Sequence, residues 1–438
     1  MATSLVDVKE KVLVFPSEPT PLKTLPLSTL DSNPLMRFDV KYLFVYRSNP
    51  GLNRNAIVAG IKNALARALV PYYPLAGRVR VGPDGKNLEV VCESQGAMFI
   101  EGVSKDITIA DLEHAPSHCL QWRDFLTKPV DDDVVCEDGA PPLVVQLTWL
   151  ANGEGAAIGV GTSHCLMDGI GTAQFLNSFA DLASGRREPD NFQPKSVWDC
   201  HLLDPTQMSL HTRNLEFNLI PDISGFFATF GSETMSPTSV VFDKTRLTKL
   251  KKLASLTGQH SELPFSFTSF EVLTAHVWRS WARSLDLPSE QILRMLFTVN
   301  IRNRLKPSLP EGYYGNGFVL TRAQATVKDL SDNDLGHTAG LIKNAKDNVG
   351  DEYVRSLIQS ISESRQTTNS VGLFMVSQWS RLGLEKVDFG MGKPVHVGPI
   401  CRERYCLFLP VYEQSDSVMV AVAMPNSAVA KYEYLLKV

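Results

Sequence analysis

The segment GTSHCLMDGIGT, residues 161–172, carries the residue types in this sequence that could do chemistry, because His164 and Asp168 stand four positions apart in it. A histidine side chain changes charge near neutral pH, so it can take a proton from an attacking hydroxyl or amine group. The same two residues could instead be half of a metal site, or a structural histidine beside an aspartate that caps a helix. The spacing alone leaves these alternatives open.

Other catalytic and metal-binding motifs are weak in this sequence. A metal site needs further ligands, and the nearest set, Glu113 with His114 and His118, lies in a proline-bearing loop without a matching pattern. The sequence has no G-x-S-x-G and no G-x-G-x-x-G after a strand, and GMGKP at 390–394 has Pro where a P-loop has Ser or Thr. We therefore expect no metal and no permanently bound cofactor. A lone histidine base suits attack on an already activated carbonyl, such as a thioester.

Local patterns place His164 where a strand meets a helix. Residues 141–164 predict a hairpin of two apolar strands joined by Asn-Gly-Glu-Gly, and the second strand leads directly to His164. Residues 170–184 have helical spacing, and Gly185 follows as a helix terminator. Loops at strand ends are common positions for catalytic residues, which favours a functional role for His164.

Composition describes an ordinary globular protein. The 438 residues are 44% hydrophobic and 21% charged, with a net charge of −4, which gives no electrostatic footprint for nucleic acid. The seven cysteines are scattered without a C-x-x-C pair, which favours reduced thiols in the cytoplasm. No apolar run approaches the roughly 20 residues of a membrane span, and the N-terminus does not resemble a signal peptide.

The chain is long enough for two or three domains, and its elements alternate in the manner of an α/β protein. We expect an N-terminal domain over 1–187, a proline-punctuated crossover linker over 188–238, and a C-terminal domain over 239–438. Helices are predicted at 245–257 and, from a Thr/Ser cap, at 267–285. The default site for a small molecule is the interface between two such domains.

HCLMDG at 164–169, taken with VDFGMGKP at 387–394, resembles the BAHD family of plant acyl-CoA-dependent acyltransferases, whose signatures are HxxxD and DFGWG. Further segments resemble the family in order and spacing, so the resemblance covers essentially the whole chain: LPLSTLD (25–31), YYPLAGR (72–78), TSFEVLTAHVWR (268–279), NIRNRLKPSLPEGYYGN (300–316) and SQWSRL (377–382). It implies an α/β fold of two chloramphenicol-acetyltransferase-like domains with mixed sheets, joined by a long crossover. The implied active site is a channel at their interface, which CoA and the acceptor enter from opposite faces.

The resemblance also implies roles for individual residues. His164 corresponds to the general base that deprotonates the acceptor. Asp168 corresponds to a structural residue that orients the histidine loop, turns away from the substrate and pairs with an arginine, here Arg302. Trp379 corresponds to a residue whose indole N–H can donate to the oxyanion of the tetrahedral intermediate, and Ser377 lies in the same lining as a CoA contact.

The second motif is assigned to support of the fold. Asp388 is expected to contact Arg or Lys side chains and to hold a turn at Gly390 and Gly392, away from the chemistry. Met391 stands where the family usually has Trp, and a polarizable Met can fill the same apolar space.

The basic segment TRLTKLKKL at 245–253 is either a solvated helix face or a CoA contact. It lies in the half of the chain that contributes most CoA contacts in the family, so Lys251 or Lys252 is predicted to meet the CoA phosphates.

The function implied by the resemblance is transfer of an acyl group from CoA to an alcohol. The donor is expected to be hydroxycinnamoyl-CoA or another aromatic acyl-CoA, because such donors are prevalent in the family. Alternatives are N-acylation of an amine and a non-catalytic accessory protein. Acyl-CoA is thus a co-substrate, and the protein is expected to be a cytoplasmic monomer of plant specialised metabolism. Residues 32–40, 377–379 and 396–404 are expected to shape the acceptor pocket.

Overall fold

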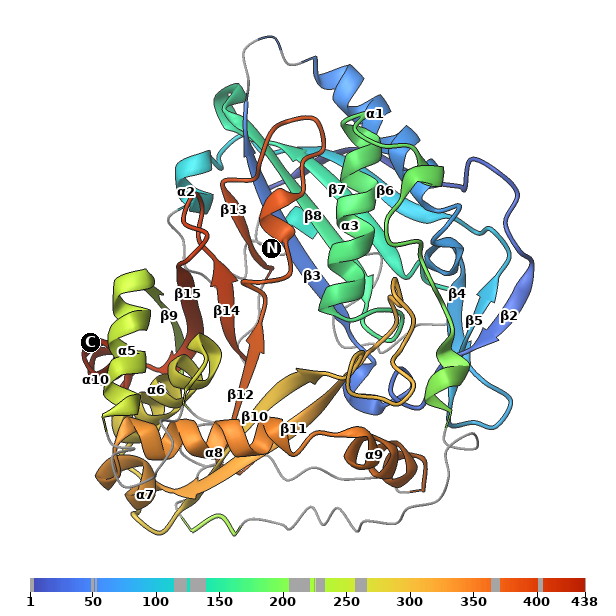
Figure 1. Cartoon of the computed structure of the whole chain (residues 1–438). Helices are drawn as coiled ribbons and strands as arrows, with labels where there is room; N and C mark the ends of the chain where they lie inside the picture. Colours follow the sequence, from blue (N-terminus) through green and yellow to red (C-terminus); the bar gives the residue numbers. More distant parts are fainter. Residues whose placement is uncertain are drawn as a thin grey trace.

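The structure is a computed structural model that describes residues 4–48, 51, 53–113, 124–126, 139–204, 221–223, 225, 233–256, 266–363, 371–400 and 405–437. These residues form an α/β fold with two six-stranded mixed sheets and a small three-stranded sheet. Figure 1 shows the two large sheets in separate halves of the molecule, which meet along one side of each. The expected fold class, α/β with two sheet-rich domains, is confirmed.

The first half is built on a sheet with the order β1-β6-β7-β8-β3-β13. Its strands are β1 (Asp7–Val14), β6 (Ala97–Val103), β7 (Leu143–Trp149), β8 (Gly155–Ser163), β3 (Asp39–Arg47) and β13 (His396–Pro399). The small sheet beside it contains β2 (Lys23–Pro26), β5 (Leu88–Cys92) and β4 (Arg78–Val81). Two long helices, α1 (Arg54–Ala68) and α3 (Gly169–Ala183), pack against one another over the large sheet (Figure 1). Short helical segments connect these elements: η1 (Pro34–Met36), η2 (Tyr73–Ala76), α2 (Ile109–Glu113), η4 (Ala151–Gly153), η5 (Pro189–Asn191) and η6 (Cys200–Leu203).

The second half is built on a sheet with the order β11-β10-β12-β14-β15-β9. Its strands are β11 (Phe318–Thr326), β10 (Ile292–Asn300), β12 (Leu373–Gln378), β14 (Cys406–Pro410), β15 (Val418–Pro425) and β9 (Met235–Phe242). The helical segments of this half are α5 (Lys244–Ser255), α6 (Ser269–Ser284), α7 (Val327–Asp332), α8 (Leu335–Asp347), α9 (Asp351–Glu363) and α10 (Val429–Leu436). The short segment η9 (Leu384–Lys386) packs instead against α3 and β13 of the first half. Helix α6 is fully integrated into the core, and it contacts α5, α7, α8 and α10.

Local sequence explains the elements that lead to His164. Every residue of β7 and β8 is buried, as expected for apolar strands in the middle of a sheet, and the predicted hairpin is confirmed. The predicted helix after Gly169 is also confirmed, and Asp168 is its N-cap, accepting a hydrogen bond from the Gly171 N–H at 2.8 Å. Helix α6 begins at the predicted cap, where Thr268 and Glu271 form a reciprocal capping box.

Sheet membership does not follow the order of the chain. Strand β13 pairs antiparallel with β3, so residues 396–399 join the first sheet although they lie far into the second half of the sequence. Strand β9 begins at Met235, inside the range predicted as a linker, while 205–220, 224 and 226–232 of that range lie outside the described residues. The division of the chain at 187 and 238 therefore stays a prediction.

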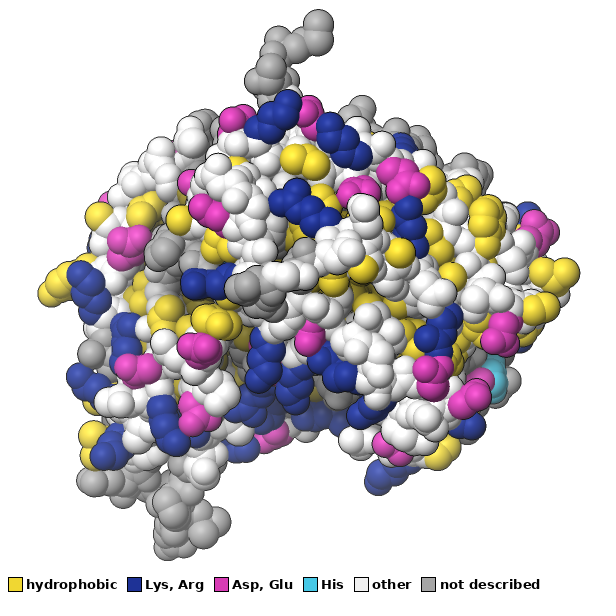
Figure 2. All heavy atoms as spheres, turned by 90° about the horizontal axis from the view of Figure 1, so that it is seen from above, with side chains coloured by type: hydrophobic (Ala, Val, Ile, Leu, Met, Phe, Trp, Pro, Cys, Tyr) yellow, Lys and Arg dark blue, Asp and Glu magenta, His cyan; other side chains and the backbone are white. Residues whose placement is uncertain are grey.

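Charged side chains of both signs are spread over the molecule. Seen from above, Lys and Arg side chains gather in the middle of the lower half of the view, beside a hollow in the surface (Figure 2). Within the described part of the chain, no helix is both long and apolar enough to cross a membrane.

Candidate active site

A cavity of about 560 Å³ lies between the two halves, and both halves contribute to its lining. His164 and the segment before β3 come from the first half, whereas β10, β11, β12 and the start of β14 come from the second. The predicted acceptor segments agree in part with this lining. Residues 35, 36, 38 and 40 and residues 377–379 border the cavity, whereas 396–400 do not, and 401–404 lie outside the described residues.

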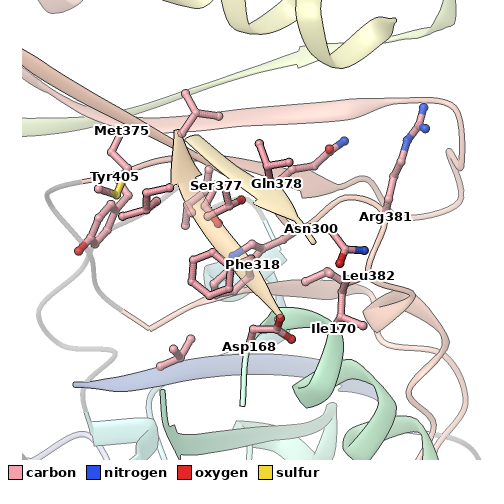
Figure 3. Close-up of a pocket in the computed structure, with 18 of the residues that line it drawn as sticks. Asp168, Ile170, Asn300, Phe318, Met375, Ser377, Gln378, Arg381, Leu382 and Tyr405 are labelled. Atoms are coloured by element: carbon pink, nitrogen blue, oxygen red, sulfur yellow. The ribbon is translucent and has the colours of Figure 1, made fainter. Parts of the chain in front are cut away.

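The cavity is lined by both polar and apolar side chains. Figure 3 shows Asn300 and Arg381 on one side, together with the apolar side chains of Leu382 and Ile170. Met375, Tyr405 and the ring of Phe318 lie on the other side. A molecule with both polar and apolar parts therefore matches this lining.

His164 stands on the short turn between β8 and α3, which places its ring at the cavity wall. The ring of Phe38 meets the imidazole edge-on with centroids 5.0 Å apart, and the ring of Phe318 lies at 5.8 Å. The backbone N–H of His164 donates to the carbonyl of Phe38 at 2.8 Å. The side chain is half-buried, so it is held by neighbours yet open to the cavity.

Asp168 borders the same cavity, but its carboxylate oxygens are occupied by donors from the protein. Arg302 donates to both oxygens, at 2.8 and 3.0 Å, in a bidentate pair. The N–H of Gly317 donates to one oxygen at 3.0 Å, and that of Gly171 donates to the other. The Asp168 side chain is only 5% exposed. Such a carboxylate is suited to holding the turn, because its hydrogen-bonding capacity is already used.

The approach of the second half to this turn requires glycine. A Cβ on Gly171 would lie 1.9 Å from the carbonyl oxygen of Tyr314, and a Cβ on Gly317 would lie 2.7 Å from the Arg302 guanidinium carbon. Both distances are far below contact distance, so larger residues would push the segment 313–317 away from the histidine turn.

Trp379 and Ser377 line the same cavity as His164, at the end of β12. The Trp379 ring packs against Tyr42 with centroids 4.8 Å apart, and its backbone N–H donates to the carbonyl of Phe408 at 2.8 Å. Trp379 is 8% exposed, so the indole is fixed in the wall. The structure thus brings the predicted base and the predicted oxyanion donor to one cavity.

The second motif forms a tight loop outside the cavity lining. One oxygen of Asp388 accepts the N–H groups of Gly390 and Gly392, at 2.9 and 2.8 Å, and the other accepts from Arg186 at 2.8 Å. Gly390 and Gly392 have φ of 90° and 92°, which favours glycine at both positions. Met391 is 3% exposed and belongs to the core of the first half, so it fills apolar space as expected.

The predicted CoA-binding lysines do not line the cavity. Lys252 is exposed and Lys251 half-buried on α5, and their role with CoA stays a prediction. The cations that do line it are Arg304, Lys346 and Arg381, which sequence patterns did not single out.

These three cations differ in their partners. Arg304 donates to the carbonyl of Lys346, near the end of α8, and to that of Val349 beyond it, while Lys346 pairs with the buried Glu271. Arg381 is exposed, and the described part of the structure gives it no carboxylate partner. In SQWSRL, Arg381 stands two residues after Trp379, and this proximity is the only sequence feature that relates Arg381 to the cavity. Among the described residues, no group of three or more His, Cys, Asp or Glu side chains could hold a metal ion; His114 and His118 lie outside them.

Comparison with solved structures shows which fold this is. Vinorine synthase is 23% identical, with a TM-score of 0.74 over 97% of this chain and 96% of that chain. TRI101 of F. graminearum, complexed with coenzyme A and T-2 mycotoxin, is 16% identical, with a TM-score of 0.77 over 94% of this chain and 97% of that chain.

Two curated relatives from Arabidopsis thaliana match this sequence almost from end to end. Omega-hydroxypalmitate O-feruloyl transferase is 34% identical over 98% of this chain and 92% of its own length. Fatty alcohol:caffeoyl-CoA acyltransferase is 32% identical over 99% of this chain and 98% of its own length.

The chain therefore has the two-sheet α/β fold of these solved structures, with a histidine at the cavity between its halves. The chain belongs to the family described as Transferase family, whose sequence profile matches residues 4–435, and this is the BAHD family that HCLMDG and DFGMG resemble. It is an acyl-CoA-dependent acyltransferase.

Proposed function

We propose that this protein transfers an acyl group from CoA to the hydroxyl group of an apolar alcohol, with His164 as the general base. The observation that carries the proposal is the position of His164, whose half-buried side chain borders a cavity with both polar and apolar lining residues. The two Arabidopsis relatives are named for acyl transfer to hydroxyl groups, which supports an alcohol as the acceptor.

The reaction needs one proton carrier and no covalent enzyme intermediate. His164 takes the proton of the acceptor O–H as the oxygen attacks the thioester carbonyl carbon. The carbonyl oxygen then carries negative charge, which the Trp379 indole N–H stabilises by donating a hydrogen bond. The C–S bond breaks, the CoA thiolate leaves, and the imidazolium returns its proton to the sulfur. Both substrates must be bound together, in the cavity that both halves line.

The apolar part of the cavity lining favours an acceptor with an apolar body. This lining includes Met375, Phe318 and Tyr405, together with Leu35 and Met36 from the first half. An amine is a cation near neutral pH, and moving it into such surroundings costs desolvation energy, whereas a neutral hydroxyl group on an alkyl chain avoids this cost. This argument favours O-acylation over N-acylation.

The side of the cavity with Arg381 is proposed to take CoA, because this guanidinium can bind a phosphate. Hydroxycinnamoyl and related aromatic groups remain the proposed donors, supported by the feruloyl and caffeoyl groups in the relatives' names. A cytoplasmic monomer remains the proposed state of the protein.

The test is release of free CoA thiol from a panel of aromatic and aliphatic acyl-CoAs, each supplied with long-chain alcohols, short polar alcohols and amines. We expect release with a long-chain alcohol, and loss of that release in His164→Ala. His337→Ala is the matched control, because His337 is exposed on α8 and does not line the cavity. Equal release by wild type and His164→Ala across the panel would overturn the enzyme proposal and favour an accessory protein. Release with amines alone would overturn the choice of acceptor.

A further inference from the structure

The backbone of His164 is held at both of its polar groups by distant segments. Its N–H donates to the carbonyl of Phe38 at 2.8 Å, and its carbonyl accepts from the side-chain Nδ2 of Asn316 at 2.7 Å. Asn316 lies 152 positions away, immediately before β11 in the second half, and is 1% exposed. A side-chain donor on the carbonyl of the proposed base limits rotation of its peptide group.

The amide of Asn316 is itself fixed by a buried carboxylate. Its Nδ2 donates to Asp31 Oδ1 at 2.7 Å, and its backbone N–H donates to the same oxygen at 3.0 Å. The Asn316 NH₂ group has two hydrogens, and Asp31 and the His164 carbonyl account for both. The amide therefore cannot turn without breaking one of these bonds.

Asp31 is anchored on its other oxygen as well. Asp31 Oδ2 accepts from the Ser28 backbone N–H at 3.1 Å and from the Ser28 hydroxyl at 2.6 Å. Asp31 is fully buried, and burial raises its pKa to about 6, although these four hydrogen bonds act in the opposite direction. Burying a carboxylate in such surroundings costs free energy. Such a cost is expected where the position of the carboxylate matters for function.

We infer that Asp31 and Asn316 are positioning residues that set the placement of His164, separately from the Asp168–Arg302 pair. The inference rests on the proposed role of His164. Neighbouring residues of the second half hold opposite ends of the histidine turn: Asn316 binds residue 164, and the Gly317 N–H binds Asp168. Loss of the Asp168 end loosens the start of α3, whereas loss of the Asn316 end moves the base itself.

The test compares Asn316→Ala with a matched asparagine. Asn177 on α3 also donates its Nδ2 to a backbone carbonyl far along the chain, that of Gly383 at 3.4 Å, and its other bond, to the carbonyl of Ala173, lies within α3. Both variants are assayed well below their melting temperatures, with kcat and the KM for acyl-CoA measured separately. We expect Asn316→Ala to lower kcat about 10- to 100-fold, the size of effect that a misplaced catalytic group produces, with little change in KM. Asn177→Ala should lower the melting temperature without lowering kcat.

A second variant tests the same inference in case Asn316→Ala folds poorly. Asp31→Asn leaves the side chain of Asn316 unchanged but replaces one of the two acceptor oxygens of Asp31 with an NH₂ donor. We therefore expect kcat to fall by less than in Asn316→Ala. Wild-type kcat in the folded variants, or an equal fall in Asn177→Ala, would overturn the inference.

Failure of the proposed function is distinguishable from failure of this inference. If wild type and His164→Ala release CoA equally, the base assignment fails. The placement of His164 is then still measured by its rate of modification with diethyl pyrocarbonate, read by mass spectrometry. A changed rate in Asn316→Ala but not in Asn177→Ala would support the positioning role, and an unchanged rate would contradict it.

Discussion

Replacing Asp168 with alanine tests whether this residue holds the histidine turn in place or takes part in the chemistry. The substitution removes both acceptors of the Arg302 pair and the cap of α3 at once. Breaking a buried ion pair from one side costs about 3–5 kcal/mol, and loss of an N-cap costs about 1 kcal/mol. Arg302 keeps bonds to the carbonyls of Tyr313 and Gly315, so we expect the lower end, about 3 kcal/mol for the pair.

The expected result is a large fall in the melting temperature. About 1 kcal/mol shifts the transition of a domain of 150–250 residues by roughly 2–4 °C, so a combined loss of about 4 kcal/mol lowers it by roughly 10 °C. We expect kcat to fall as well, because the turn that carries His164 loses its anchor. His164→Ala should instead abolish turnover with a small change in melting temperature, since the imidazole is half-buried at the cavity wall.

Differential scanning calorimetry beside the thiol-release assay measures both quantities. Asp243→Ala is the control, because Asp243 caps α5 in the same way, accepting from the Arg246 N–H at 2.7 Å, but is exposed. It should lose only the capping contribution and keep full activity. The reasoning is refuted if Asp168→Ala has the same melting temperature as wild type while its kcat falls as far as that of His164→Ala. Asp168 would then act in the chemistry.

Three further predictions concern other residues. Trp379→Phe should lower kcat about 10²- to 10³-fold in the thiol-release assay with the KM for acyl-CoA nearly unchanged, and an unchanged kcat would remove the indole from the oxyanion role. Gly171→Ala should reduce soluble yield sharply, because its Cβ would lie 1.9 Å from the Tyr314 carbonyl oxygen, and normal yield and melting temperature would contradict this. Burial lowers the pKa of His276 to about 4 from 6.5, so the folded state binds fewer protons than the unfolded state between these pH values. The contribution of His276 to the free energy of unfolding should be constant above pH 6.5 and fall by roughly 3 kcal/mol toward pH 4. Chemical denaturation should find this pH dependence missing when His276→Gln is compared with wild type.

Sequence reasoning succeeded where the determining contacts are local. The hairpin before His164, helix α3 and the capping box of α6 follow from patterns within a few residues of each element. The partner of Asp168 lies 134 positions away, and it was found through the family resemblance and not through spacing. No periodicity could have supplied that pair.

The remaining features depend on how distant segments meet. Strand β13 joins the first sheet through pairing with β3, and nothing in its four residues indicates a partner. The basic segment of α5 marked a charged helix face, but a charge pattern does not show which side chains border a cavity. Arg381 is a single cation in the sequence and forms no charge pattern, so the sequence does not indicate that it borders the cavity. Lys251 and Lys252 do form such a pattern, but they lie outside the cavity lining. Asp31 and Asn316 are 285 positions apart, and their pairing follows only from the docking of the two halves.

The placement of the proposed base therefore depends on contact between the two halves. His164 follows β8 of the first sheet, but Arg302 and Asn316 of the second half hold the two ends of its turn. Because the cavity walls come from the same two halves, one docking event creates the substrate site and orients the histidine within it. Conditions that loosen the contact should lower kcat before either sheet unfolds. Mild urea should consequently reduce thiol release at concentrations where far-ultraviolet circular dichroism is still unchanged, and coincident loss of both would contradict this coupling.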